Sequence, residues 1–367
     1  MNSEETRSSL EPEIRAEGAD PTQRCEQGSG SFFLGNDGRL RSGWRVAAFL
    51  VAFIFLIQLL LPIVLIAAIC VVVTMTGGQA GLKEFLNGSL QGAALQQGMA
   101  LVLTPAALLL AWPFRRWLDR RSYRSMGFWW DRSTGIDLFL GLVMGSALVM
   151  LLTGAFLLSG LYLWKGTVAF GSELALRMLL AVAGLAAAAM LEELVFRAYV
   201  QSNLTESIGP VWALAISSLG FAVMHGANPN VTLFGLINLF AAGVLLGLVY
   251  HRFRSIWAVW TMHFAWNFTM GPLLGVPVSG VTMASICRVE LADPNTLARP
   301  DWWVLTGGPF GLEGGLGATV IMGLFILGLA VWKGRPARPA EPIGRRAEEA
   351  AEAGGEAPPE APPASGP

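Results

Sequence analysis

The stretch LLAVAGLAAAAMLEELVFR (residues 179–197) is an apolar run that ends in two carboxylates and a guanidinium. Residues 179–191 carry no charge, and Glu192, Glu193 and Arg197 then follow closely. Ionisable side chains are costly at membrane depth, so those found there usually serve a function. This stretch therefore predicts a membrane helix that contributes charged groups to a functional site.

The composition of the whole chain favours a polytopic membrane protein. Of its 367 residues, 53% are hydrophobic and only 14% are charged, which is below the share typical of a soluble domain. The net charge of −1 indicates no nucleic-acid surface, so we expect no nucleic-acid partner. The three cysteines, Cys25, Cys70 and Cys287, have no metal-ligand spacing and form no disulfide framework.

Apolar segments long enough for membrane helices recur along the chain. A bilayer core needs about 20 apolar residues per helix, and this length predicts an all-α bundle of about eight spans. The expected spans are 44–75, 94–113, 136–164, 173–200, 210–227, 231–250, 255–272 and 315–333. The expected organisation is a disordered tail (1–42), N-terminal helices (43–172), a core (173–272), an extracytoplasmic loop (273–314), a last helix (315–333) and a second disordered tail (334–367).

Basic residues predict the orientation of these spans, because lysine and arginine gather on the cytoplasmic side. Four clusters fall on one side of an eight-span arrangement, so both termini are expected in the cytoplasm. In a bacterium the protein would then be a multi-pass protein of the plasma (inner) membrane. The clusters are Arg39, Arg41 and Arg45; Arg115, Arg116, Arg120, Arg121, Arg124 and Arg132; Arg252 and Arg254; and Lys333, Arg335 and Arg338.

Two later apolar segments carry further polar residues. His225 ends segment 210–227, while His263 and Asn267 stand four residues apart in segment 255–272 and share one helical face. A rise of about 1.5 Å per residue places Glu192 and His263 at similar depths of about 12–16 Å, whereas His225 lies at roughly 22 Å. His225 therefore fits a common site least well, and each of these residues could instead hydrogen-bond between helices.

Helical geometry separates the two carboxylates. Glu193 and Arg197 are four residues apart, which predicts a salt bridge on one face. Glu192 is rotated by about 100° from Glu193 and has no local partner. A buried carboxylate in that position requires a proton, a water molecule or a group from another helix.

One glutamate and two histidines can support hydrolysis in two ways. Glu192, His225 and His263 could hold zinc or another divalent metal whose bound water becomes a nucleophile, or they could activate water without a metal. The sequence leaves both routes open. The chain has no His-Glu-x-x-His motif of the usual zinc-protease helix. It also has no Gly-x-Ser-x-Gly elbow, so a serine hydrolase is disfavoured.

The order Glu-Glu-x-x-x-Arg, Phe-x-x-x-His and His-x-x-x-Asn within residues 173–272 resembles the CAAX prenyl endopeptidase and bacteriocin-processing (CPBP, Abi-like) family of intramembrane proteases. The resemblance implies that Glu192 is the general base, that His225 holds the water, and that His263 and Asn267 stabilise the oxyanion. It also implies that Glu193 and Arg197 shape and neutralise the site and that Phe221 packs beside His225. The family is classed with metalloproteases, although a metal-free glutamate mechanism has also been proposed for it.

These observations favour an intramembrane endopeptidase that cleaves membrane-associated or lipidated peptides and whose partners are the lipid bilayer and a peptide or protein substrate. Two alternatives come from other classes. A proton-coupled transporter would also explain buried glutamate and histidine, although no internal repeat is apparent. A non-catalytic membrane scaffold or immunity factor would use the same helices without turnover.

Overall fold

The computed structural model describes residues 32–35, 38–76, 92–169, 171–293, 295 and 299–334. Most of the two tails that we expected to be disordered, 1–42 and 334–367, lies outside the described residues. At the end of the N-terminal tail, Leu34 and Leu40 form an antiparallel bridge, and Phe32 packs against Trp44 in the first helix. This part of the tail is therefore folded onto the membrane domain.

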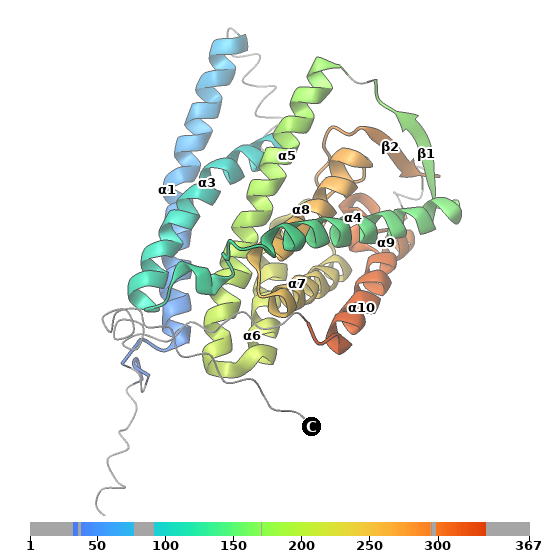
Figure 1. Ribbon diagram of the computed structural model, residues 1–367. Coiled ribbons are helices and arrows are strands. Elements are labelled where there is room, and N and C mark those ends of the chain that lie inside the picture. Colours follow the sequence, from blue (N-terminus) through green and yellow to red (C-terminus); the bar gives the residue numbers. More distant parts are fainter. Residues whose placement is uncertain are drawn as a thin grey trace, which may run out of the picture.

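The described part of the chain is mostly helical (Figure 1). In Figure 1, α1 and α5 stand upright, α4 lies across the front of the view beside α8, and α10 closes the lower right side. The α-helices are α1 (Ser42–Thr76), α3 (Ala93–Pro113), α4 (Thr134–Leu158), α5 (Ser172–Glu193), α6 (Ser202–Met224), α7 (Leu233–Phe253), α8 (Ile256–Phe268), α9 (Pro300–Thr306) and α10 (Leu316–Val331). Three of them continue into π-helical segments, at Phe114–Leu118, Leu194–Gln201 and Thr269–Leu273.

Five helical segments of the described chain are long and apolar enough to cross a membrane, judged by length and composition. They are Ser42–Val71, Leu95–Leu118, Thr134–Leu158, Ser172–Ala227 and Leu233–Phe253. The expected spans 255–272 and 315–333 correspond to α8 with its π-helical end and to α10, which are shorter. The count of eight spans therefore stays a prediction, although each expected segment contains a helix.

The long segment Ser172–Ala227 contains two of the expected spans, because the chain bends at Gly209. Gly209 has φ 80° and ψ 167°, a conformation that is essentially restricted to glycine, and Pro210 follows it. Helix α5 descends in Figure 1, and α6 turns at the bottom of the view. The bend lets the second half of α6 return toward α5. The end of α6, just before His225, therefore lies near the charged residues of α5.

The expectation of an all-α fold is wrong at one place, since the described residues include a two-stranded sheet. We expected a helix over 136–164, but α4 ends at Leu158, and Gly160 adopts a left-handed φ of 73°. Strand β1 (Tyr162–Thr167) then pairs antiparallel with β2 (Cys287–Leu291), with Tyr162 opposite Leu291. An apolar run does not reveal a pairing with a strand so distant in sequence, because the partner supplies the hydrogen bonds.

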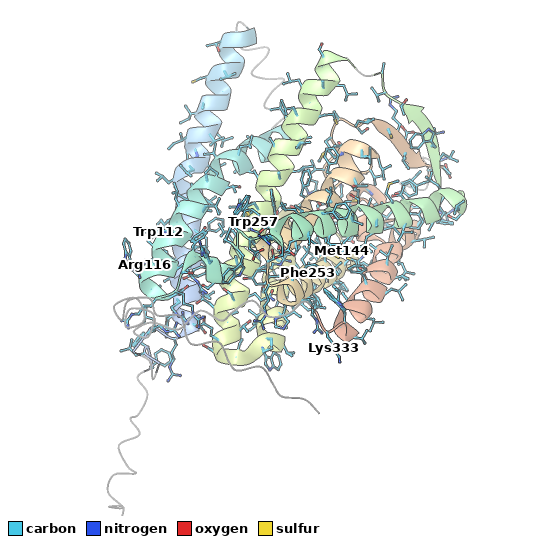
Figure 2. All side chains as sticks on the ribbon, in the orientation of Figure 1. Trp112, Arg116, Met144, Phe253, Trp257 and Lys333 are labelled. Atoms are coloured by element: carbon cyan, nitrogen blue, oxygen red, sulfur yellow. The ribbon has the colours of Figure 1, made fainter. Side chains whose placement is uncertain are left out.

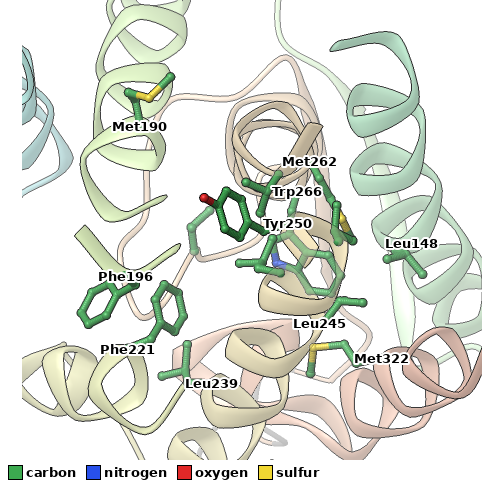
Figure 3. Packing of buried hydrophobic residues seen from close by; sticks show 14 of the residues in the cluster. Leu148, Met190, Phe196, Phe221, Leu239, Leu245, Tyr250, Met262, Trp266 and Met322 are labelled. Carbon is green, nitrogen blue, oxygen red and sulfur yellow. The ribbon is translucent and has the colours of Figure 1, made fainter. Parts of the chain in front are cut away.

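Apolar side chains both fill the interior and cover the outside. A continuous buried cluster joins α4 to α10 and includes Leu148, Phe196, Phe221, Met262 and Met322 (Figure 3). On the outer faces, large apolar side chains remain exposed over several helices (Figure 2), among them Phe55, Leu109, Trp112, Leu151 and Leu179. A lipid environment accounts for exposed apolar faces of this extent.

A buried ionic cluster links the start of α1 to the end of α3. Asp119 is fully buried and accepts hydrogen bonds from Arg45 (3.1 Å) and Arg115 (3.0 Å). Asn203 of α6 also donates to this carboxylate, at 3.1 Å. Two of the basic clusters used to predict orientation thus lie at the same end of the bundle, although which side faces the cytoplasm stays a prediction.

Small residues bring α4 unusually close to α8. A Cβ atom built on Gly145 would lie 2.2 Å from the carbonyl oxygen of Met262, and one built on Gly141 would lie 2.2 Å from the carbonyl oxygen of Ala258. Glycine at these positions therefore permits backbone contact between the two helices. Since Met262 precedes His263, this packing also fixes the depth of His263.

We expect Gly145→Ala to lower the free energy of unfolding by about 1–3 kcal/mol, because the new methyl group must push α8 away. Gly154→Ala is the matched control, since Gly154 lies on the same helix and a Cβ built there has no heavy atom within 4 Å. Chemical unfolding of both purified variants in detergent micelles measures the effect. Equal stability of the two variants would contradict the close packing of α4 on α8.

Candidate active site

The two adjacent glutamates lie where α5 changes from α-helical to π-helical geometry. Helix α5 ends at Glu193, and residues Leu194–Gln201 form the π-helical segment. Single π-helical stretches inside longer helices are frequent at functional sites. Glu192 and Glu193 themselves stand in the last α-helical turn, where adjacent side chains lie about 100° apart and so meet different surroundings.

Glu193 and Arg197 form the predicted salt bridge. Their side chains are fully buried, and the Oε1 atom of Glu193 lies 3.0 Å from NH1 of Arg197. Arg197 also donates to the carbonyl of Gly243 at 3.4 Å, and its guanidinium carbon lies 4.4 Å from the centre of the Phe221 ring. The two opposite charges compensate each other inside the bundle, which a single buried charge could not do.

Glu193 also orients His263. Nδ1 of His263 donates to Oε1 of Glu193 at 2.7 Å, and the His263 side chain is 9% exposed. Because the carboxylate can only accept, this bond places the proton on Nδ1 and turns Nε2 the other way. Nε2 of His263 faces Glu192, at 3.8 Å from its Oε2 atom.

His225 is oriented by its own helix end. It follows α6 in a 3-10 turn (His225–Ala227), and its Nδ1 donates to the carbonyl of Phe221 at 2.8 Å. Its Nε2 atom therefore faces Glu192, at 3.7 Å from Oε2. The depth estimate that separated His225 from the other two residues is thus wrong, since His225 approaches the same carboxylate oxygen as His263.

Phe221 packs between the charged and imidazole groups. Its ring centre lies 4.6 Å from that of His225 and 5.9 Å from that of His263, with a T-shaped arrangement in the second case. Phe196 covers its other side at 5.6 Å (Figure 3). The contact between Phe221 and His225 is the one that the family resemblance implied.

Glu192 is the accessible carboxylate of the pair. Its side chain is 29% exposed, whereas that of Glu193 is fully buried, and its Oε2 atom has no hydrogen-bond partner among the described residues. Both histidine nitrogens lie beyond hydrogen-bond distance from this oxygen. The Oε2 atom of Glu192 is thus a buried acceptor that the described residues leave without a donor.

These residues line one cavity of about 410 Å³. Asn267 lines the same cavity, four residues after His263. Most of the remaining lining is apolar and comes from α3, α5, α7, α8 and α10. These apolar side chains include Met99, Leu103, Leu185, Leu245, Met262 and Met322.

Metal binding finds no support in the geometry of the residues that the structure describes. None of their His, Cys, Asp and Glu side chains form a group of three or more that is arranged to hold a metal ion. The ligand set of Glu192, His225 and His263 that the sequence left open for zinc or another divalent metal therefore stays a prediction. In the structure, the Nε2 atoms of both imidazoles face the carboxylate of Glu192.

Glu313 is a cavity residue that sequence reasoning missed. It lines the same space, is 8% exposed, and accepts a hydrogen bond from Nε1 of Trp266 at 2.9 Å. Its sequence signal is a single charge in the glycine-rich stretch 307–315, directly before the last apolar segment. Only the folded chain shows that this carboxylate faces the cavity.

Apolar helices that surround a carboxylate and two imidazoles on one cavity define a helical membrane protein with a polar site in its interior. Residues 174–269 match the family model described as type II CAAX prenyl endopeptidase Rce1-like, and the chain thus contains a domain of that family. The match includes Glu192, Glu193, Arg197, Phe221, His225, His263 and Asn267, and it ends before Glu313. No curated protein matches the chain.

We expect Arg197→Leu to destabilise the protein by about 3–5 kcal/mol, because it leaves the Glu193 charge buried without its cation. The double variant Glu193→Gln with Arg197→Leu should recover part of this loss, since it removes the uncompensated charge. Unfolding of the single and double variants in the same detergent measures the difference. A double variant that is no more stable than Arg197→Leu would show that the pair does not compensate as described.

Proposed function

We propose that the protein is an intramembrane endopeptidase in which Glu192 activates water for attack on a peptide bond. The proposal depends mainly on one observation, the approach of Nε2 of His225 and Nε2 of His263 to the same oxygen of Glu192, at 3.7 and 3.8 Å. Separations of this size exceed a direct hydrogen bond and suit polar groups that share one bridging water molecule. The Rce1-like domain supports the same reaction class.

Glu192 is the general base of the proposed reaction. It takes a proton from the water as the water oxygen forms a bond to the carbonyl carbon of the substrate. His225, whose Nδ1 proton is held by the Phe221 carbonyl, accepts the other hydrogen of the water through Nε2 and fixes its direction. Glu192 then transfers its proton to the leaving amine as the C–N bond breaks.

His263 and Asn267 stabilise the oxyanion that forms during the attack. His263 donates through Nε2 when its ring carries both protons, with Nδ1 bonded to Glu193. The amide of Asn267 is a second donor on the same face of α8. A single donor of this kind is worth roughly 10²–10³ in rate.

The apolar lining of the cavity favours an apolar or lipidated peptide as substrate. Methionine and leucine side chains from several helices surround the carboxylate and the imidazoles. Desolvation by this lining strengthens the interactions between the reacting charges. Cleavage of membrane-associated peptides is therefore the activity that the site supports best.

Replacing Glu192 by glutamine should lower kcat by about 10²–10⁴-fold, because the amide keeps the shape of the side chain but cannot accept the proton. Cleavage of a fluorogenic apolar peptide library by purified protein in detergent or liposomes measures the rate. Glu173→Gln is the matched control, since Glu173 lies on the same helix and its side chain is 78% exposed. Wild-type turnover by a folded Glu192→Gln variant would refute the assignment.

Removal of metal ions should leave the cleavage rate unchanged, because the proposed proton transfers use only protein side chains and water. The same assay is run after dialysis against EDTA and 1,10-phenanthroline, with elemental analysis of the dialysed sample. If activity disappears with the metal and returns when zinc is added, the metal-free mechanism is wrong.

A further inference from the structure

Glu313 gives the cavity a second carboxylate, outside the domain matched by the family model. It lies in the 3-10 turn Leu312–Gly314, directly before α10, and is 8% exposed. Its backbone is held by Asn238 of α7, whose amide donates to the carbonyls of Glu313 at 2.8 Å and Gly315 at 2.9 Å. The position of this turn is therefore fixed from two directions, by α7 and by the start of α10.

Three hydrogen bonds hold the Glu313 carboxylate itself. Nε1 of Trp266 donates to Oε1 at 2.9 Å, while the backbone N–H and the hydroxyl of Ser279 donate to Oε2 at 2.8 and 2.6 Å. Both oxygens act as acceptors, as in an ionised carboxylate. Oε1 receives one bond from the described residues, so this oxygen keeps an acceptor position for a further donor.

No cation balances this charge within the described part of the chain. The buried carboxylates Asp119 and Glu193 each have an arginine within 3.1 Å. No ion pair among the described residues includes Glu313. A buried charge without a counter-ion is costly in an apolar cavity, even when hydrogen bonds reduce the cost. A bound molecule that carries a cation would remove this imbalance.

The two charged parts of the cavity lie close enough for one peptide to contact both. Trp266, which holds Glu313, follows His263 by three residues on α8, a rise of about 4.5 Å. The lining that both share is largely apolar, with Leu239, Met262 and Met322 among its residues. A peptide in this cavity would meet Glu192, the histidines and Glu313 on one continuous lining.

We propose that Glu313 is a specificity-determining residue that selects a peptide with a cationic side chain, lysine or arginine, near the cleaved bond. This inference rests on the proposed endopeptidase function for its substrate class. Its physical basis is separate, because it depends on the unbalanced carboxylate and not on the chemistry of Glu192. Binding measurements can therefore test it without turnover.

The experiment compares pairs of short apolar peptides that differ only in lysine or norleucine at one scanned position. Their dissociation constants are measured on the Glu192→Gln variant, so that binding is read without cleavage, with Glu313 present or replaced by glutamine. At the position facing Glu313, the ratio of norleucine to lysine dissociation constants should fall by about 10- to 100-fold in Glu313→Gln, the range for hydrogen bonds to a charged group. Glu290→Gln is the control, since Glu290 lies in β2 and is exposed.

If Glu313→Gln does not fold, the same peptide binding is measured on Trp266→Phe instead. This variant removes the donor to Oε1 and leaves the carboxylate more poorly satisfied, so the preference for lysine should increase. A purely structural role for Glu313 predicts lower unfolding temperatures with an unchanged ratio at every position, and that result would overturn the inference. Failure of the wild-type protein to cleave any peptide would refute the proposed function, while the binding ratios would still decide the role of Glu313.

Discussion

The buried ion pair of Glu193 and Arg197 is the interaction on which the rest of the site depends. A fully buried ion pair rarely improves stability over an apolar pair of the same size, because removing both charges from water is costly. Here the pair has a second use, since Oε1 of Glu193 also accepts from Nδ1 of His263 at 2.7 Å. It therefore ties α5 to α8 and orients the imidazole toward Glu192.

The fold supplies the close approach that this interaction needs. Gly141 and Gly145 let α4 press against the backbone of α8, while the π-helical segment after Glu193 and the bend at Gly209 direct the α5–α6 chain. His225 then reaches the same carboxylate from the end of α6. Together these features place one carboxylate and two imidazoles on the wall of a single cavity.

Much of this arrangement could be predicted from the sequence, because local spacing determined it. The apolar segments predicted the helices, and the four-residue spacing of Glu193 and Arg197 predicted their salt bridge, which is confirmed. The motif order also indicated the family, which the match over residues 174–269 confirms. Such features depend on the period of the helix, which a sequence shows directly.

The remainder depends on contacts between distant segments. The pairing of β1 with β2, the approach of His225 to Glu192 and the hydrogen bonds to Glu313 all join residues that lie far apart in sequence. An estimate of depth from residue counts assumes straight helices, so it failed at His225. Glu313 escaped notice because its partners, Trp266 and Ser279, look like ordinary membrane and loop residues until the chain is folded.

These contacts describe a site in which the protein orients both imidazoles through their Nδ1 atoms and leaves their Nε2 atoms to face one carboxylate oxygen. The central claim is that this geometry holds a single water molecule for attack. A high-resolution experimental structure of the purified protein in lipid tests it most directly. We expect one ordered solvent oxygen within about 3.2 Å of Oε2 of Glu192 and of Nε2 of His225 and His263. Rings too far apart to share that solvent molecule, or a metal ion bound in its place, would show that Glu192 and the two histidines do not hold the attacking water.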